Sequence, residues 1–97
     1  MKALPDHVVA YKRTPEFTES SVPNGLLHSH NTKAGVWGRI VVLDGELTYR
    51  ILEPVQEELL LGAGDCGIVE PMVKHEVKPQ GRVRFYVEFY RDVLLSA

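Results

Sequence analysis

Turn-forming residues recur so closely along this chain that no long helix fits between them. Prolines, glycines and the dipeptides Asn-Gly and Asp-Gly fall at positions 5, 15, 23–25, 35, 44–45, 54, 62, 64, 71, 79 and 81. Proline removes a backbone donor and glycine weakens a helix, so a helix of a dozen residues has no room. The segments between the turns are rich in Val, Ile, Leu, Tyr and Phe, which is typical of strands. The pattern predicts an all-β protein.

The positions of the strands follow from the alternation of apolar and polar side chains. Residues 46–52 and 83–90 alternate, which is typical of a sheet with one face in the core. Asp44-Gly45 predicts a tight type I′ hairpin between residues 36–43 and 46–52, because Asp-Gly readily adopts the positive φ angles of that turn. Further strands are expected over residues 8–12, 26–30, 56–61, 66–69 and 75–78. About eight short antiparallel strands predict a sandwich or a barrel.

Length and composition indicate one ordinary globular domain over residues 1–97. The chain is 44% hydrophobic and 25% charged, whereas a disordered chain has fewer apolar residues and more net charge. Eleven basic and thirteen acidic residues leave a net charge of −2. This balance argues against nucleic acid or an anionic membrane as the main partner.

The sequence also predicts where the protein resides. No apolar run approaches the roughly 18 residues that cross a bilayer, and the first residues lack the apolar stretch of a secretory signal. The single cysteine, Cys66, has no partner for an intramolecular disulfide. We therefore expect a cytoplasmic protein without a membrane segment. Cys66 is interpreted as a small buried hydrophobe, with a redox-responsive thiol as the alternative.

Three of the four histidines stand where metal chemistry is plausible. His28 and His30 are two residues apart in an expected strand, where side chains at i and i+2 share a face and can reach one ion. Such a pair also arises by chance, so it is a weak signal alone. His75 follows a short apolar strand and Pro71, and this arrangement can aim its imidazole into a barrel. The alternative for His75 is a half-buried ring bonded to a backbone carbonyl. His7 is interpreted as a surface residue.

The surroundings of these histidines resemble a known family. Gly25-Leu-Leu-His28-Ser-His30 with Gly45 at a turn is similar to the first motif of cupins, and Gly64-Asp65, Pro71 and His75 are similar to the second. More specifically, residues 30–38 and 69–75 resemble the small TehB/YeaR-like cupins, a family named after tellurite-resistance protein TehB. Residues 11–15 and 85–90 fit the same pattern, so the resemblance covers nearly the whole chain.

This resemblance implies a cupin-type double-stranded β-helix, an antiparallel jelly-roll barrel with a metal ion in its mouth. His28, His30 and His75 become the candidate metal ligands. The chain departs from the general cupin pattern where Ala34 and Gly35 replace a glutamate, and where Pro71 and His75 are four residues apart with no glycine between them. The identity of the fourth metal ligand therefore stays undecided. Water is favoured over a substrate oxygen, Glu70 or Glu88.

The cofactor expected from the resemblance is one divalent transition metal ion, and imidazole ligands suit zinc, iron, nickel or manganese. The leading function is a metal-binding module of a bacterial stress response, to tellurite or another toxic oxyanion or to nitrosative stress. One alternative is a mononuclear iron or nickel oxygenase acting on a small molecule. The other is a metal-free module for ligand binding or interaction, in which the histidines are structural. Whether the chain is an enzyme stays open.

Other side chains and partners are assigned more coarsely. A small molecule or an oxyanion is the expected ligand; Lys33 could attract such an anion, with a solvated loop lysine as the more ordinary interpretation. Residues 36–43 are apolar on both faces, which, together with the resemblance, predicts a homodimer. Tyr86, Glu88 and Tyr90 share one face of the last strand, which either lines the cavity or faces solvent. A methyltransferase domain, which follows a domain like this one in some bacterial tellurite-resistance proteins, does not fit in 97 residues.

Overall fold

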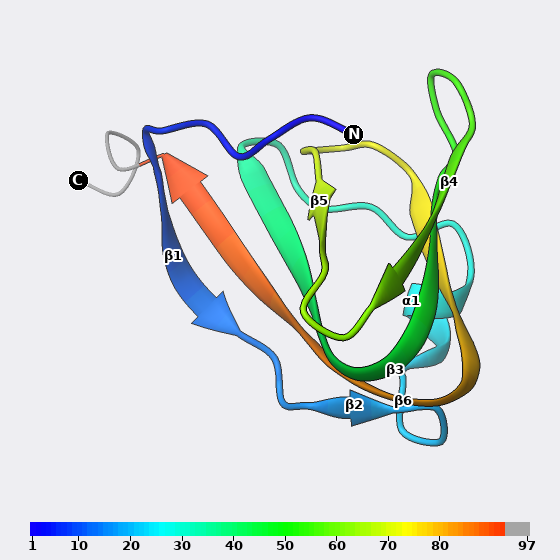
Figure 1. Ribbon diagram of the computed structural model, residues 1–97. Helices are drawn as coiled ribbons and strands as arrows, with labels where there is room; N and C mark the ends of the chain where they lie inside the picture. The colour runs from blue at the N-terminus through cyan, green and yellow to red at the C-terminus, as the bar shows by residue number, and fades with distance from the viewer. Residues whose placement is uncertain (93–97) are drawn as a thin grey trace.

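Two long antiparallel strands form the frame of the computed structural model, which describes residues 1–92. The strands β3 (Val36–Ile51) and β6 (His75–Asp92) pair from Val36 and Arg91 at one end to Ile51 and His75 at the other. Figure 1 shows that both strands turn at the same place and run back, so the two-stranded ribbon is folded upon itself. The inner faces of its two halves therefore lie opposite each other.

Four shorter strands widen this ribbon. β1 (Val8–Arg13) pairs with the end of β6, and β2 (Phe17–Thr18) pairs with its middle. β4 (Glu57–Gly62) pairs with the second half of β3, and β5 (Cys66–Val69) pairs with the first half. The prediction of an all-β antiparallel fold is confirmed. The described residues form one six-stranded sheet in the order β1-β6-β3-β4, with β2 and β5 added at β6 and β3, and the sheet is not closed.

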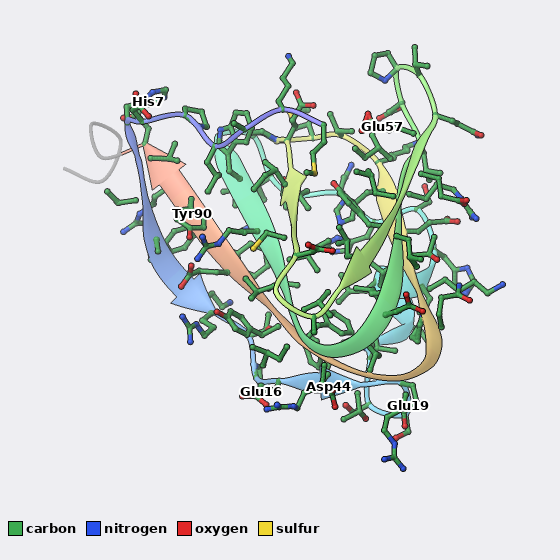
Figure 2. The ribbon with its side chains drawn as sticks, in the orientation of Figure 1. His7, Glu16, Glu19, Asp44, Glu57 and Tyr90 are labelled. Carbon is green, nitrogen blue, oxygen red and sulfur yellow. The ribbon has the colours of Figure 1, made fainter. Side chains whose placement is uncertain are left out.

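The predicted hairpin at Asp44-Gly45 is wrong, because both residues lie inside the continuous strand β3. The register with β6 shifts between Val42 and Asp44 and again between Gly45 and Leu47, which marks a bulge at the bend of the ribbon. Asp44 lies at this bend in Figure 2. Gly45 has the positive φ of +77° that the dipeptide suggested, but it serves a bulge and not a turn. Residues on either side of the bulge therefore pair with β6 rather than with each other.

Two other expected strands also differ from the structure. Within residues 26–30, the chain forms the end of a helical turn, α1 (Asn24–Leu27), and then a bend before His30. The segments 75–78 and 83–90 belong to the single strand β6, which continues through Pro79 and Gly81. The predictions for β1, β4 and β5 are confirmed to within a residue.

The predicted alternation places the core correctly. Leu47, Tyr49 and Ile51 are buried, and so are Val83, Phe85 and Val87 on the facing half of the ribbon. The buried Tyr49 hydroxyl donates a hydrogen bond of 2.7 Å to the Ile68 carbonyl, so this polar group does not stay unpaired inside the core. The core therefore lies between the two halves of the folded ribbon.

The other face of the last strand is the outer face of the sheet. Glu88 accepts hydrogen bonds from Arg13 and Arg39, each at 3.1 Å, and from the Tyr90 hydroxyl. The guanidinium carbon of Arg13 lies 4.3 Å from the centroid of the Tyr86 ring. Tyr86, Glu88 and Tyr90 are thus half-buried side chains of this outer face. The homodimer stays a prediction. No helix among residues 1–92 is long and apolar enough to cross a membrane.

Gly45 should be intolerant of any side chain. A Cβ atom there would lie 2.0 Å from the Arg82 carbonyl oxygen of the paired strand, and the φ of +77° is strained for other residues. Gly45→Ala should lower the free energy of unfolding by at least about 2 kcal/mol, as measured by urea denaturation. Gly25→Ala is the matched control, because a Cβ at Gly25 meets nothing within 4 Å. Equal stability of the two variants would contradict the role of the bulge.

Candidate functional site

His30 and His75 face each other across an isolated backbone bridge. The His30 N–H donates to the His75 carbonyl and the His75 N–H donates to the His30 carbonyl, both at 2.7 Å. Residues paired in this way project their side chains to the same face of a sheet. The two imidazole centroids are 5.3 Å apart, and the ring planes are nearly perpendicular at 84°. The bridge therefore brings two histidines from distant parts of the chain together.

Both rings line a narrow interior pocket. His30, Thr32 and His75 are its polar side chains, and the rest of the lining is Gly38 and apolar residues of α1, β3, β5 and β6. The cavity of about 20 Å³ is large enough for one water molecule or one ion. An organic substrate does not fit inside it. The pocket is therefore suited to a single small species held by imidazole nitrogens.

His75 is held as a neutral imidazole. Its residue is only 3% exposed, and its Nδ1 lies 3.3 Å from the Val73 carbonyl oxygen. Burial lowers the pKa of His75 below its ordinary value; the Val73 carbonyl opposes this shift and the neighbouring His30 adds to it. If Nδ1 donates to Val73, Nε2 carries the free lone pair. A neutral imidazole with a free lone pair is the form that binds a metal ion.

His30 has a buried nitrogen without a partner. Its Nδ1 atom is inaccessible to solvent and makes no hydrogen bond in the structure. A buried polar atom left unpaired costs free energy, so native sites generally supply a partner such as a side chain, water or ion. Because His30 and His75 line the same pocket, a small species in that pocket would lie beside both rings.

His28 does not join these two histidines. It is exposed and lies in a separate groove with Arg50, Glu76 and Lys78. The cause is Ser29, whose φ of +41° interrupts the extended backbone that would place His28 and His30 on one face. Among residues 1–92, no group of three or more His, Cys, Asp or Glu side chains is arranged to hold a metal ion. The three-histidine site stays a prediction.

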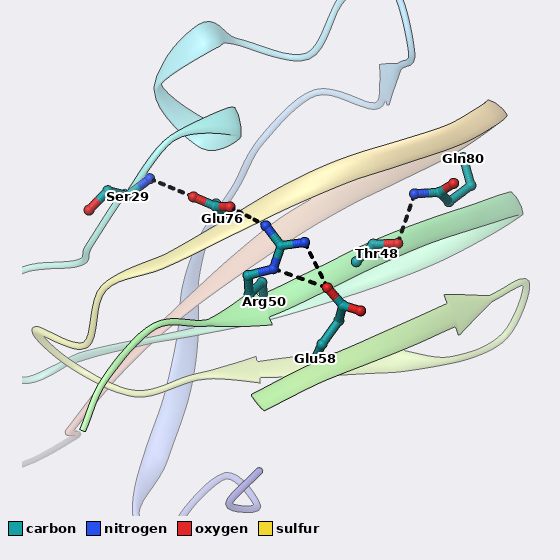
Figure 3. A network of polar contacts seen from close by, with 6 residues as sticks. All are labelled: Ser29, Thr48, Arg50, Glu58, Glu76 and Gln80. Atoms are coloured by element: carbon teal, nitrogen blue, oxygen red, sulfur yellow. Dashed lines mark hydrogen bonds and ion pairs between the residues drawn. The ribbon is translucent and has the colours of Figure 1, made fainter. Parts of the chain in front are cut away.

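The Ser29 bend is tied to a polar network on the sheet (Figure 3). The Ser29 N–H donates to Glu76 Oε1 at 3.4 Å, and Glu76 Oε2 accepts from Arg50 Nη1 at 2.6 Å. Arg50 also donates to Glu58 Oε1 from Nε at 3.0 Å and from Nη2 at 2.7 Å. Nearby, Gln80 donates to the Thr48 hydroxyl at 2.9 Å. Glu76 and Arg50 thus support the conformation that keeps His28 outside.

The other suggested ligands lie away from the pocket. Glu88 is on the outer face, and Glu70 forms an ion pair of 3.4 Å with Lys2. Neither lines the His30–His75 pocket. Cys66 is a half-buried free cysteine on β5, in register with Val41, and it does not line the pocket either. Water as a further ligand stays a prediction.

A second, open pocket of about 210 Å³ adjoins the first at His30. His30, Thr32 and Phe89 line both pockets, and Lys12 and Lys33 line only the open one. The Thr32 hydroxyl donates to the Val36 carbonyl at 2.8 Å, which fixes the loop between His30 and β3. We call this open pocket the mouth. Lys12 and Thr32 are not indicated by any local sequence pattern, because their positions at the mouth depend on tertiary pairing.

Comparisons with known proteins point to one family. Residues 12–87 match the family model of the TehB-like domain. The curated TehB of Haemophilus influenzae, a probable S-adenosyl-L-methionine-dependent methyltransferase, is 29% identical over 79 residues, which are 77% of this chain and 28% of that protein. The chain thus spans less than a third of the length of this relative.

Solved structures are similar over nearly the whole chain. A protein from E. coli strain K12 has a TM-score of 0.85 at 21% identity, covering 95% of this chain and 98% of its own. The structure of TehB from Haemophilus influenzae has a TM-score of 0.76 at 26% identity, covering 90% of this chain and 32% of its own. A cupin-2 domain protein from Shewanella frigidimarina has a TM-score of 0.52 at 12% identity, covering 89% and 72%. These similarities confirm the cupin-type fold.

The buried His75 should make the metal-free protein less stable in mild acid. The unfolded chain binds a proton at His75 near pH 6.5, whereas the folded chain, with its lowered pKa, binds it only at lower pH. Stability should therefore be greatest above about pH 6.5 and fall as the pH drops toward 5. Urea unfolding at several pH values measures this slope.

His75→Gln should flatten that slope, because the group that titrates differently in the two states is gone. His28→Gln, which replaces an exposed histidine, is the control and should keep the slope. A slope that survives His75→Gln unchanged would assign the acid sensitivity to another group.

Proposed function

We propose that this chain, which belongs to the TehB-like domain family, is a metal-binding cupin whose ion is held by His30 and His75. The observation that carries the proposal is the buried, unpaired Nδ1 of His30 beside the neutral His75 ring. Two imidazole side chains lining a cavity of about 20 Å³ match one divalent transition metal ion such as zinc, iron, nickel or manganese. When bound, such an ion supplies Lewis acidity or redox chemistry.

The chain's own residues orient the two ligands and keep the pocket dry. The backbone bridge sets the distance between His30 and His75, and the Val73 carbonyl fixes the orientation of the His75 ring. The Tyr49 ring, centred 6.0 Å from that of His75, packs behind it. The apolar lining excludes bulk water, which strengthens electrostatic interactions inside the pocket.

His28 is proposed as a third ligand that joins when the chain straightens at Ser29. An extended Ser29 would place His28 and His30 on the same face of the strand. A positive φ is uncommon for serine, so straightening relieves strain while it breaks the long Ser29–Glu76 hydrogen bond of 3.4 Å. The ion thus favours a local conformation in which three imidazoles meet.

The physiological role that we propose is a bacterial response to tellurite or another toxic oxyanion, or to nitrosative stress. Family membership supports this role. Methyl transfer is not part of the proposal, because the match spans 28% of the curated methyltransferase. The antiparallel sheet of residues 1–92 also differs from the parallel, glycine-loop sheet that binds a methyl donor. The expected ligand is a small molecule or an oxyanion.

Elemental analysis of untagged protein, purified without chelator or affinity metal, tests the proposal. We expect about one equivalent of a divalent transition metal per chain. His30→Ala and His75→Ala should each remove it while the circular dichroism of the sheet persists, and His7→Ala, an exposed histidine, should keep it. If the bound metal is iron or nickel, an oxygenase reaction is the activity to test next. Protein that contains no metal and takes up none would leave a metal-free binding module.

His28→Ala separates a two-histidine site from a three-histidine site. If His28 joins on binding, this variant should bind Zn²⁺ about ten-fold more weakly in a calorimetric titration of the metal-free protein. Ser29→Val should act in the opposite direction, because a β-branched residue disfavours the positive φ that keeps His28 outside. Unchanged affinity in both variants would restrict the ligands to His30 and His75.

A further inference from the structure

We propose that Lys12 and Lys33 form a binding site for a small anion at the mouth of the His30–His75 pocket. The sequence alone suggests Lys33 for this role, whereas Lys12 is identified only by the structure. This inference deepens the proposed function and rests on it only in treating this pocket as the functional end of the fold. It names the residues that select the ligand and the charge that the ligand carries.

The first observation is a bulge in β1 that aims Lys12 into the mouth. Ala10 pairs with Tyr90, but the next pair is Lys12 with Phe89, so Tyr11 is an extra residue. A regular ladder would place Lys12 opposite Glu88, whose side chain is on the outer face. With the bulge, Lys12 lies opposite Phe89 and lines the mouth with it. Bulges interrupt the ladder and commonly re-aim side chains next to functional sites.

The second observation is that the positive charge of the mouth is not neutralised. Within residues 1–92, neither Lys12 nor Lys33 has a carboxylate at ion-pair distance, and no Asp or Glu lines the mouth. Arg91 does not line the mouth, but its guanidinium carbon lies 4.5 Å from the ring centroid of Tyr11, which does. The chain as a whole has a net charge of −2, so this local excess of cations is a property of the mouth.

The third observation is that the mouth leads to the unpaired histidine. Because His30 and Thr32 line both pockets, a ligand in the mouth lies next to the ring whose Nδ1 has no partner. The mouth, at about 210 Å³, accepts a group of several atoms, whereas the interior accepts one ion or water. The geometry points to an inorganic oxyanion or a small carboxylate bound by the lysine ammonium groups, next to the histidine pair.

Lysine suits this role because its ammonium group offers three donors and a compact charge. Both lysines are exposed, so solvent and salt screen their attraction for the anion. We therefore expect weak, salt-dependent binding of the anion. We also expect anions to reach the pocket faster than they would without the two lysines.

The test is a titration of metal-free protein, dialysed free of chelator, with inorganic phosphate and separately with acetate. Amide nitrogen–proton NMR spectra locate the bound anion and give its Kd. Shifts should centre on Asn31, Thr32 and Lys33, and binding should weaken several-fold when NaCl rises from about 20 to about 200 mM. If phosphate binds more tightly than acetate, the ligand class is an inorganic oxyanion. If acetate binds more tightly, the ligand class is a carboxylate. Acetamide, which is similar in shape to acetate but uncharged, should not bind.

Variants identify the cations that carry the site. Lys12→Gln and Lys33→Gln should each raise the Kd of the preferred anion about three- to five-fold, and the double variant should raise it about ten-fold. Lys78→Gln is the matched control, because Lys78 is an exposed lysine in the separate groove with His28. This control should bind as the unmodified protein does.

Four results would overturn the inference: no binding of either anion, wild-type affinity in the double variant, an equal loss in Lys78→Gln, or shifts centred elsewhere on the sheet. Because the protein is metal-free, none of these results depends on whether His30 and His75 bind an ion. The metal content of the double variant gives the separate readout. If the double lysine variant keeps its metal and loses anion binding, both proposals are supported. Loss of metal in the His30 and His75 variants bears only on the proposed function.

Discussion

The bend of the β3–β6 ribbon at Gly45 is the constraint on which the rest of this structure depends. The two strands pair along nearly their whole length, and a straight ribbon would leave its apolar face in water. Folding the ribbon upon itself buries that face, and the bulge allows the turn without ending either strand. Gly45 is required at this point because the Arg82 carbonyl occupies the space of a side chain.

The site follows from the same frame. β6 begins at His75, and the loop after α1 returns to pair with it for a single residue, His30. The two rings therefore meet at one end of the folded ribbon, where the apolar core ends. Two properties of the pair go with this position: burial lowers the pKa of His75, and the buried Nδ1 atom of His30 has no hydrogen-bond partner. Polar atoms at the margin of a core are costly unless a ligand satisfies them.

The interior pocket and the mouth differ in charge. Several cations elsewhere on the sheet are matched: Arg13 and Arg39 by Glu88, and Arg50 by Glu58 and Glu76. The mouth, in contrast, presents Lys12 and Lys33 without acidic neighbours among the described residues. A largely apolar pocket lined by two imidazoles, with a cationic entrance, suits a bound cation inside and an anion beside it. The proposed metal and anion sites are thus complementary in charge.

The sequence by itself determined the all-β class and the buried face of each alternating strand, because these depend on residue type and a period of two. It gave His28, His30 and His75 as three candidates, and only the tertiary structure paired His30 with His75. It also indicated a positive φ at Gly45. Only the tertiary structure decided that this angle serves a bulge, since hairpin turns and bulges use the same backbone region. It likewise decided that His28 lies away from the histidine pair and that Lys12 lines the mouth. The spacing rule for side chains assumes an unbroken strand, and the left-handed Ser29 and the bulge at Tyr11 each break it.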